Sequence, residues 1–283
     1  MVTKMTKKIT PLNLLVEIGA EELPLSALDL IYADFKMAFG KLLERERISF
    51  SAIEVEATPR RIAFFVSDLS AKQKDLKLEI SGPSVEKAYD VAGKPTPALL
   101  GFIKSKEITE QDIEVRDTPK GKFIFGHKEL KGKITAQVLP TLIQEVFQTM
   151  PFKRGLRWDS TGYKFPRPIR WIVAILGATV LKFKIADVTS GKTSYGHRFL
   201  SPKAFTITKA DWPAYSKLLE KQQVILSIER REALIRDELA KKYGQKNPDE
   251  ELVHECAQLV EKPFLIEGGF SKEYLEQIGR AHV

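Results

Sequence analysis

Basic and flat aromatic side chains alternate along one fifty-residue segment, between Pro151 and Leu200. Ten residues of this segment are basic, and only Asp159 and Asp187 are acidic. Its excess of eight positive charges equals the net charge of the whole chain, +8. A local excess of this size favours a polyanionic partner, with a basic face that has no partner as the alternative. The ten basic residues are Lys153, Arg154, Arg157, Lys164, Arg167, Arg170, Lys182, Lys184, Lys192 and Arg198.

Three short motifs in this segment combine guanidinium groups with aromatic rings. Arginine pairs with phosphate through two parallel hydrogen bonds, and aromatic faces stack on unpaired bases, so the combination is typical of RNA recognition. For the arginines, contact with RNA and exposure to solvent without a partner are equally compatible with the sequence. Trp158, Phe165 and Trp171 have the alternative of lying in the core, which we favour for the two tryptophans. The motifs are Lys153-Arg154-x-x-Arg157-Trp158, Phe165-Pro166-Arg167-Pro168-x-x-Trp171 and Tyr195-Gly196-His197-Arg198-Phe199.

Three glutamates, Glu17, Glu21 and Glu22, lie where a predicted strand leads into a predicted helix. Neighbouring carboxylates of this kind could hold a magnesium ion for phosphoryl transfer. Negative charge also complements the exposed N–H groups at the start of a helix, and we favour this interpretation for Glu21 and Glu22. Glu17 is expected to be buried in its strand or to pair with Arg60 or Arg61.

The residue types do not predict a catalytic centre. Cys256 is the only cysteine, which excludes a disulfide framework and a cysteine-rich zinc site. The sequence contains neither a glycine-rich phosphate-binding motif nor the nucleophile motif of hydrolases. We therefore predict that this chain has no catalytic residue and no metal site, and that it binds no cofactor itself.

The composition is that of a globular protein that can build a substantial core. Of the 283 residues, 43% are hydrophobic and 29% are charged. No apolar run approaches the roughly 20 residues of a membrane helix. The basic N-terminal residues are followed by acidic ones and lack the apolar centre of a signal peptide. We therefore expect a cytoplasmic protein.

Hydrophobic periodicity predicts the elements that position these side chains. An amphipathic helix is expected over residues 25–46, and two strands are expected to form a hairpin around Thr58-Pro59-Arg60-Arg61. Further helices are predicted at 98–105, 135–150, 209–222, 227–243 and 249–261. Strands are predicted at 12–18, 53–57, 62–66, 123–129, 170–177, 179–186 and 264–266.

These elements predict an α+β fold with two mixed α/β domains, built mainly from antiparallel sheets with packed amphipathic helices. We expect a flexible tail over residues 1–10, an N-terminal α+β domain over 11–150 and a second, basic α+β domain over 151–277. Residues 278–283 can be encoded by the first bases of a widely used sequencing adapter. We expect this last segment to be derived from such an adapter, and the start of further domains to be missing.

A set of motifs, in a fixed order along the chain, resembles one known family. Leu14-Leu15-Val16-Glu17-Ile18-Gly19-Ala20-Glu21-Glu22-Leu23-Pro24 is similar to the opening motif of the β subunit of bacterial glycyl-tRNA synthetase. The family usually has Thr at the position of Ala20 and Trp at that of Lys262. The other matches are Thr58-Pro59-Arg60-Arg61, Gly82-Pro83, Gly93-Lys94-Pro95-Thr96, Lys153-x-x-x-Arg157-Trp158, Phe165-x-Arg167-Pro168, Gly196-His197-Arg198-Phe199 and Leu259-Val260-Glu261-x-Pro263.

The resemblance implies an α₂β₂ enzyme that attaches glycine to tRNA(Gly), with the catalytic site in the α subunit. ATP and Mg would be used by the complex through that subunit, and this fragment alone would be inactive. The expected partners are the α subunit and tRNA(Gly), with neither DNA nor a membrane. A free-standing RNA-binding module and a metal-dependent nucleotidyl or phosphoryl transferase are the alternatives. The predicted tRNA-binding residues are Lys153, Arg154, Arg157, Lys164, Arg167, His197, Arg198, Arg60 and Arg61.

Overall fold

The structure is a computed structural model that describes residues 12–244 and 249–274. The tails expected at 1–10 and 278–283 lie outside these ranges. Along the chain run β1 (Leu12–Ala20), α1 (Leu25–Arg45), β2 (Ala52–Thr58), β3 (Arg61–Leu69), β4 (Leu76–Ser84), α2 (Val85–Ala88), α3 (Pro97–Lys106), β5 (Ile113–Thr118), β6 (Gly121–Leu130), α4 (Thr135–Thr149), β7 (Ile169–Leu176), β8 (Thr179–Val180), β9 (Lys184–Ile185), β10 (Val188–Thr189), β11 (Thr193–Tyr195), β12 (Ala204–Thr206), α5 (Trp212–Lys221), α6 (Ile228–Tyr243) and α7 (Glu250–Leu259).

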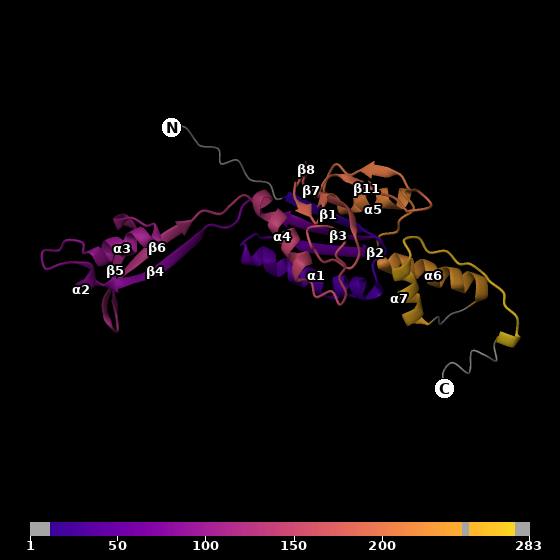
Figure 1. Ribbon diagram of the computed structural model, residues 1–283, viewed down its shortest axis with the longest axis horizontal. Coiled ribbons are helices and arrows are strands. Elements are labelled where there is room, and N and C mark those ends of the chain that lie inside the picture. Colours follow the sequence, from indigo (N-terminus) through magenta and orange to yellow (C-terminus); the bar gives the residue numbers. More distant parts are fainter. Residues whose placement is uncertain (1–11, 245–248, 275–283) are drawn as a thin grey trace.

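A five-stranded antiparallel sheet forms the centre of the molecule, with the strand order β2-β3-β1-β7-β8 (Figure 1). The hairpin predicted around Thr58–Arg61 is confirmed, because β2 and β3 pair directly across that turn. The α+β class is confirmed as well, since the sheets are antiparallel and the helices pack beside them.

The central sheet is covered on both faces, and β1 shows how the sequence arranges this. Leu14, Val16 and Ile18 point to a core shared with α1 and α4. Leu15 points to the other face, where it joins a smaller core with α5. Because side chains alternate along a strand, Glu17 also points to the face with α5. A single strand thus contributes to both cores.

The main core contains a cluster of phenylalanine rings. Phe35 and Phe39 of α1 lie 4.8 and 5.1 Å from Phe64 of β3, measured between ring centroids. Phe147 of α4 joins them and also contacts Phe165 edge-on at 6.0 Å. These contacts fix the segment that connects α4 to β7, because Phe165 is only 1% exposed.

The domain boundary expected at residue 150 would separate strands that belong to one sheet, because β1, β2 and β3 precede it and β7 and β8 follow it. β7 follows that position in the chain, yet it pairs with β1 over most of its length, from Leu14↔Leu176 to Ala20↔Ile169. The two expected domains therefore share one sheet, which corrects the boundary at residue 150. Local periodicity predicts that β7 is a strand, but it carries no information on which distant strand becomes its neighbour.

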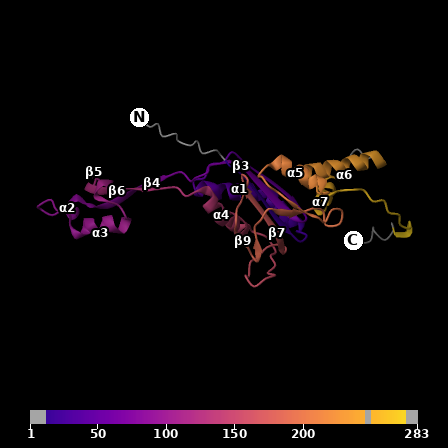
Figure 2. The ribbon, with the colours of Figure 1, turned by 90° about the horizontal axis from the view of Figure 1, so that it is seen from above.

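Residues 76–130 form a separate three-stranded sheet with the order β4-β6-β5, which we call the arm. The arm projects away from the central sheet in both views (Figures 1 and 2). Its own small core contains Ala88, Leu99 and Ile124. At its base, the Gln73 amide donates to the Lys133 carbonyl at 2.9 Å and so joins the two chain segments that lead to the arm.

Buried Arg231 joins the helices α6 and α7 to the central sheet. Its side chain is fully buried and donates to four backbone carbonyl groups at 2.6–2.9 Å. These carbonyls belong to Ala57, Ile225, Leu226 and Ala257. The predicted helix over 227–243 is confirmed as α6, with the Ser227 hydroxyl as its N-terminal cap.

Some local predictions were wrong. The strand expected at 264–266 does not form, and the strand expected at 179–186 consists only of the two short strands β8 and β9. Two strands of the arm, β4 and β5, were not predicted. Among the described residues, no helix has both the length and the apolar character that crossing a membrane requires.

Candidate nucleic-acid interface

Five of the sequence motifs meet at one end of the central sheet. The end of β1 is bound to the β2–β3 turn, because the Ala20 amide donates to the Arg60 carbonyl at 2.9 Å. It is also bound to the segment before β7, since the Glu21 amide donates to the Pro168 carbonyl at 3.0 Å. Side chains from β11 and from the segment after α7 complete the group, as the next paragraphs show. Residues far apart in the sequence therefore form one site.

Two glycines allow this close packing. A Cβ atom on Gly19 would lie 1.9 Å from the Trp171 ring, so only glycine lets this indole lie across β1. A Cβ atom on Gly196 would lie 2.2 Å from the Ser201 carbonyl oxygen. Gly196 thereby permits the tight turn after β11 that displays Arg198 and Phe199.

A fully buried carboxylate, Glu17, lies at the base of the site. It accepts hydrogen bonds from the Trp171 indole, the Tyr215 hydroxyl and, at 2.7 Å, the Ser194 hydroxyl. Arg61 lies 3.4 Å from it, which confirms the expected burial and the pairing with Arg61. The burial of Glu17 is thus compensated by donors from β3, β7, β11 and α5.

Arg61 is also fully buried and joins the same network to the segment after α7. Its Nε donates to Glu261 at 2.9 Å, and one terminal nitrogen donates to the Tyr195 carbonyl at 3.0 Å. Burial works to raise the pKa of Glu261, but Arg61 and the Thr58 hydroxyl outweigh it and hold that pKa below its usual value. Both groups therefore remain charged, and the network keeps Tyr195 and Trp171 in place.

Above this network lies a cavity of about 340 Å³ lined by arginine and aromatic side chains, which we call the arginine pocket. Glu21 lines this pocket and pairs with Arg170 at 2.6 Å, with Arg198 at 3.4 Å and with Arg60 at 4.0 Å. Arg60 also lies over the Trp171 ring at 5.8 Å. The pocket is lined by Glu21, Arg60, Arg170, Trp171, Tyr195, Gly196, Arg198 and Pro202.

A second hollow of about 230 Å³ adjoins the arginine pocket and shares Arg60 and Arg198 with it. We call it the aromatic hollow, because Phe199 and Phe264 line it and are 82% and 64% exposed. His197 lines it too, and its Nδ1 accepts from the Phe199 and Leu200 amides at 3.3 and 3.2 Å. Burial, together with the nearby arginines, lowers the pKa of His197. This histidine therefore shapes the turn as a neutral acceptor.

The structure divides the predicted tRNA-binding residues into separate groups. Arg60, His197 and Arg198 line the two hollows, while Arg61 lies buried beneath them and cannot contact a ligand directly. Lys164 lies at a different hollow of about 530 Å³, together with Lys184. The remaining members, Lys153, Arg154, Arg157 and Arg167, belong to the segment between α4 and β7.

That connecting segment is partly ordered by its own basic groups. Arg157 Nε donates to the Gly162 carbonyl at 3.1 Å, and Arg167 donates to the neighbouring Pro166 carbonyl. Lys153, Arg154 and Arg157 are exposed. The core positions favoured for the tryptophans are confirmed, because Trp171 is 7% exposed and Trp158 packs against the main core.

Three residues of the candidate site, Arg170, Tyr195 and Glu21, are not among the binding residues predicted from the sequence. Arg170 and Tyr195 line the arginine pocket, and both lie in the basic segment between Pro151 and Leu200. Glu21 was expected to complement the start of α1, but the first turn of that helix contains no acidic residue. Glu21 and Glu22 precede the helix, and the nearby guanidinium groups bind them instead.

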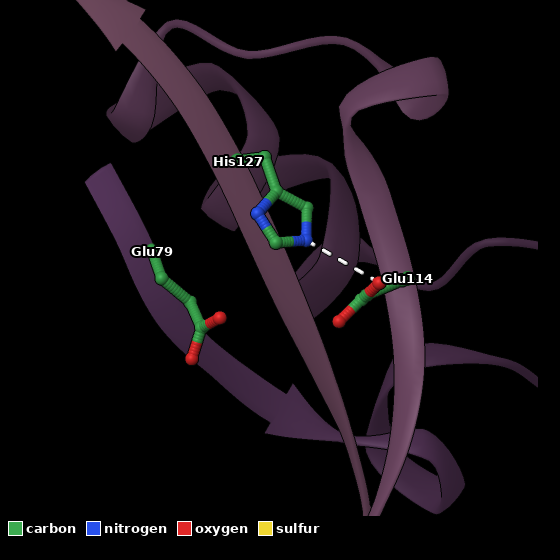
Figure 3. A group of neighbouring side chains, drawn as sticks. All are labelled: Glu79, Glu114 and His127. Carbon is green, nitrogen blue, oxygen red and sulfur yellow. Dashed lines mark ion pairs between the residues drawn. The ribbon is translucent and has the colours of Figure 1, made fainter. Parts of the chain in front are cut away.

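The three glutamates do not form the metal site considered for a transferase. Glu17 is bound by the buried donors, and the other two carboxylates pair with arginines. Among the described residues, the only group of three with ligand atoms close enough for a cation is Glu79, Glu114 and His127 on the arm (Figure 3). Arg116 binds both of these carboxylates, so this group is compensated without a metal.

Comparison with known proteins shows that the chain is similar to a component of an aminoacyl-tRNA synthetase. The family described as "Glycyl-tRNA synthetase beta subunit" matches residues 14–277. The chain belongs to the glycyl-tRNA synthetase β-subunit family.

Relatives from several bacteria support this membership. The chain is 38% identical to a glycine–tRNA ligase β subunit of Syntrophotalea carbinolica over 268 residues. It is 33% identical to that of Moorella thermoacetica over 268 residues and 36% identical to that of Clostridioides difficile over 267 residues. Each match covers 93% of this chain but only 38–39% of the relative. The chain therefore spans about two fifths of the length of these relatives.

Proposed function

We propose that this chain is the tRNA-binding part of the β subunit of a heterotetrameric glycine–tRNA ligase in the cytoplasm. In this proposal it holds tRNA(Gly) while a partner α subunit joins glycine to the tRNA. ATP and Mg are used by the complex through that α subunit, and this chain binds no cofactor. Family membership and the concentration of positive charge between Pro151 and Leu200 support the proposal.

The single observation that carries the proposal is the convergence of arginines from distant segments. Arg60 lies in the turn between β2 and β3, Arg170 lies on β7, and Arg198 lies in the turn after β11. All three line one pocket beside exposed aromatic rings. Guanidinium groups recognise phosphate, and aromatic faces accept unpaired bases. This combination suits an RNA ligand better than a small neutral substrate.

Equilibrium binding of tRNA(Gly) to the chain tests the proposal. Arg154→Ala, Arg157→Ala and Arg167→Ala should each weaken binding by about 3- to 10-fold, with little change in preference among tRNA sequences, because phosphate contacts carry no sequence information. Lys36→Ala is the matched control, since Lys36 is an exposed cation on α1 that pairs with Glu54. Unchanged affinity in all three arginine variants would contradict the predicted role of the connecting segment.

Two further measurements separate the proposal from a free-standing RNA module. The chain should co-purify with a glycyl-tRNA synthetase α subunit, which an independent RNA-binding module would not do. The chain alone should catalyse no glycine-dependent pyrophosphate exchange. Exchange activity of the isolated chain would place a catalytic site here and overturn the proposed division of labour.

A further inference from the structure

The arginine pocket and the aromatic hollow form two adjoining compartments with a shared wall. Arg60 and Arg198 line both of them. Tyr195 stands in the first compartment and is 40% exposed, while Phe199 stands in the second and is 82% exposed. Each compartment therefore offers an aromatic ring to solvent, and both compartments contain the guanidinium groups of Arg60 and Arg198 in their lining.

The shared wall has an unfilled hydrogen-bonding position. Arg60 Nε is buried and has no hydrogen-bond acceptor among residues 12–244 and 249–274; the closest carboxylate oxygen, from Glu22, is 3.8 Å away. Burial and the neighbouring charge of Arg198 both lower the pKa of Arg60. A buried donor without an acceptor carries a free-energy cost, and a bound anionic oxygen removes it once the Arg60 side chain shifts toward the ligand, because this nitrogen is closed to solvent in the free chain.

The backbone that carries the two exposed rings is fixed by hydrogen bonds. Tyr195 packs edge-on against Trp171 at 5.1 Å, and Arg61 binds its carbonyl. Phe199 follows the tight turn at Gly196, where the His197 amide donates to the Gln222 carbonyl at 2.9 Å. Aromatic side chains have only two rotatable side-chain angles, so they lose little conformational entropy when a ligand stacks on them. An exposed phenylalanine on such a turn is thus suited to stacking.

We propose that the two compartments bind two successive unpaired nucleotides of an RNA strand. One base stacks on Tyr195, the next stacks on Phe199, and the phosphate that links them is bound by Arg60 and Arg198. This inference rests on the proposed tRNA-binding function and deepens it, because it assigns single-stranded RNA to this site. Sequence-independent stacking and phosphate binding predict weak preference among the bases.

Fluorescence anisotropy with labelled hexauridylate RNA and a 12-base-pair RNA duplex tests the proposal on the whole chain. Tyr195→Leu and Phe199→Leu keep apolar bulk but remove the aromatic face. Each should weaken hexauridylate binding by about 5- to 50-fold and leave duplex binding unchanged. Tyr243→Leu is the matched control, since Tyr243 is a 51% exposed aromatic residue at the end of α6.

Photocrosslinking to wild-type protein gives a second measurement that needs no variant. Hexanucleotide RNA with 4-thiouridine should crosslink to the tryptic peptides Thr193–Arg198 and Phe199–Lys203. Crosslinks confined to other peptides, or wild-type affinity in both leucine variants, would overturn the proposal. If tRNA binding nonetheless persists with its salt dependence, only this site assignment fails. If the chain binds neither RNA nor tRNA, the proposed function fails with it.

Discussion

Glu17 has a structural role that Glu21 and Glu22, the other two glutamates near the end of β1, do not share. Its carboxylate is fully buried and connects donors from β3, β7, β11 and α5. Removing one partner of a buried ion pair leaves the other charge uncompensated, which costs much more than losing an exposed pair. The walls of the arginine pocket therefore depend on this one side chain.

Glu17→Gln should lower the free energy of unfolding by about 3 kcal/mol, because the substitution leaves buried Arg61 with a single carboxylate partner. Urea denaturation followed by far-UV circular dichroism measures the loss. Glu54→Gln is the matched control: Glu54 is 52% exposed and pairs with Lys36, so its loss should cost less than about 0.5 kcal/mol. Equal effects of the two substitutions would show that the buried network does not stabilise the fold.

Glu56 links the stability of the molecule to pH. Burial, together with the negative charge of Glu229, raises the pKa of this carboxyl group to about 7, although the Ile228 amide and the Tyr32 hydroxyl donate to it and the positive charge of Arg231 lies nearby. Its usual value is 4.5. The folded state therefore binds the proton more tightly than the unfolded state. The resulting stability is fully present below about pH 4.5 and is lost as the pH rises through about 7.

This shift predicts that the free energy of unfolding falls by up to about 3 kcal/mol between pH 4.5 and pH 8 through Glu56 alone. Glu56→Gln should remove this contribution, so the variant should show a flatter pH profile than wild type. Denaturant titrations at several pH values measure it. Glu54→Gln, on the same strand, should retain the wild-type slope, and an unchanged slope in Glu56→Gln would refute the assignment.

For individual residues, the sequence predicted where charged groups lie more readily than which residues they contact. Burial of Glu17 and its pairing with Arg61 were predictable, because a lone acid in an apolar strand needs a cation. Tyr215 and Ser194 were not predictable as partners, since each is polar in an unremarkable context and lies at least 177 residues away. Arg170 and Tyr195 were visible as residue types, but only the sheet brings them to one pocket.

The arm behaves as an element of its own. Between Leu76 and Leu130 there are nine basic and nine acidic residues, so its net charge is zero, in contrast to the segment after Pro151. Its ends are adjacent, since Leu76 pairs with Leu130. The contact between Gln73 and Lys133 lies outside it and closes its base. The arm can therefore be removed without breaking the central sheet.

Replacing residues 77–129 with a four-residue Gly/Ser linker should leave the fold of the remaining chain intact and tRNA affinity within about 2-fold of wild type, because the arm adds no net charge. Thermal unfolding and tRNA binding of the shortened chain measure the two effects. The control is Arg198→Gln in the shortened chain, which should weaken tRNA binding because Arg198 lines both the arginine pocket and the aromatic hollow. A large loss of tRNA affinity without the arm would assign it a direct role.

Elements with strong local signals were predictable, and those defined by distant partners were not. The helix α1 and the β2–β3 hairpin follow from periodicity and from a short turn. β4 alternates Leu76, Leu78 and Ile80 with charged residues, a strand pattern in a segment whose charge obscured it. The position of β7 beside β1 depends on pairing between residues that are 149 to 162 positions apart in the chain, which no local pattern encodes.

On the scale of the whole molecule, charge and architecture point to the same end of the central sheet. The five-stranded sheet brings five of the sequence motifs together there, while the neutral arm extends away from it (Figures 1 and 2). The positively charged connecting segment leads directly into β7, which carries Arg170 and Trp171. Because β7 joins this segment to the arginine pocket, one polyanion can contact both of them.

The salt dependence of tRNA(Gly) binding tests the central claim most directly. If the basic groups of this chain neutralise several phosphates, the logarithm of the association constant should fall linearly with the logarithm of salt concentration. Each phosphate contributes a slope of about −0.7 to −0.9, so four or more contacts predict a slope of about −3 or steeper. Arg198→Gln should make the slope shallower by about one contact. An affinity that stays constant from 50 to about 300 mM salt would contradict RNA binding through these residues.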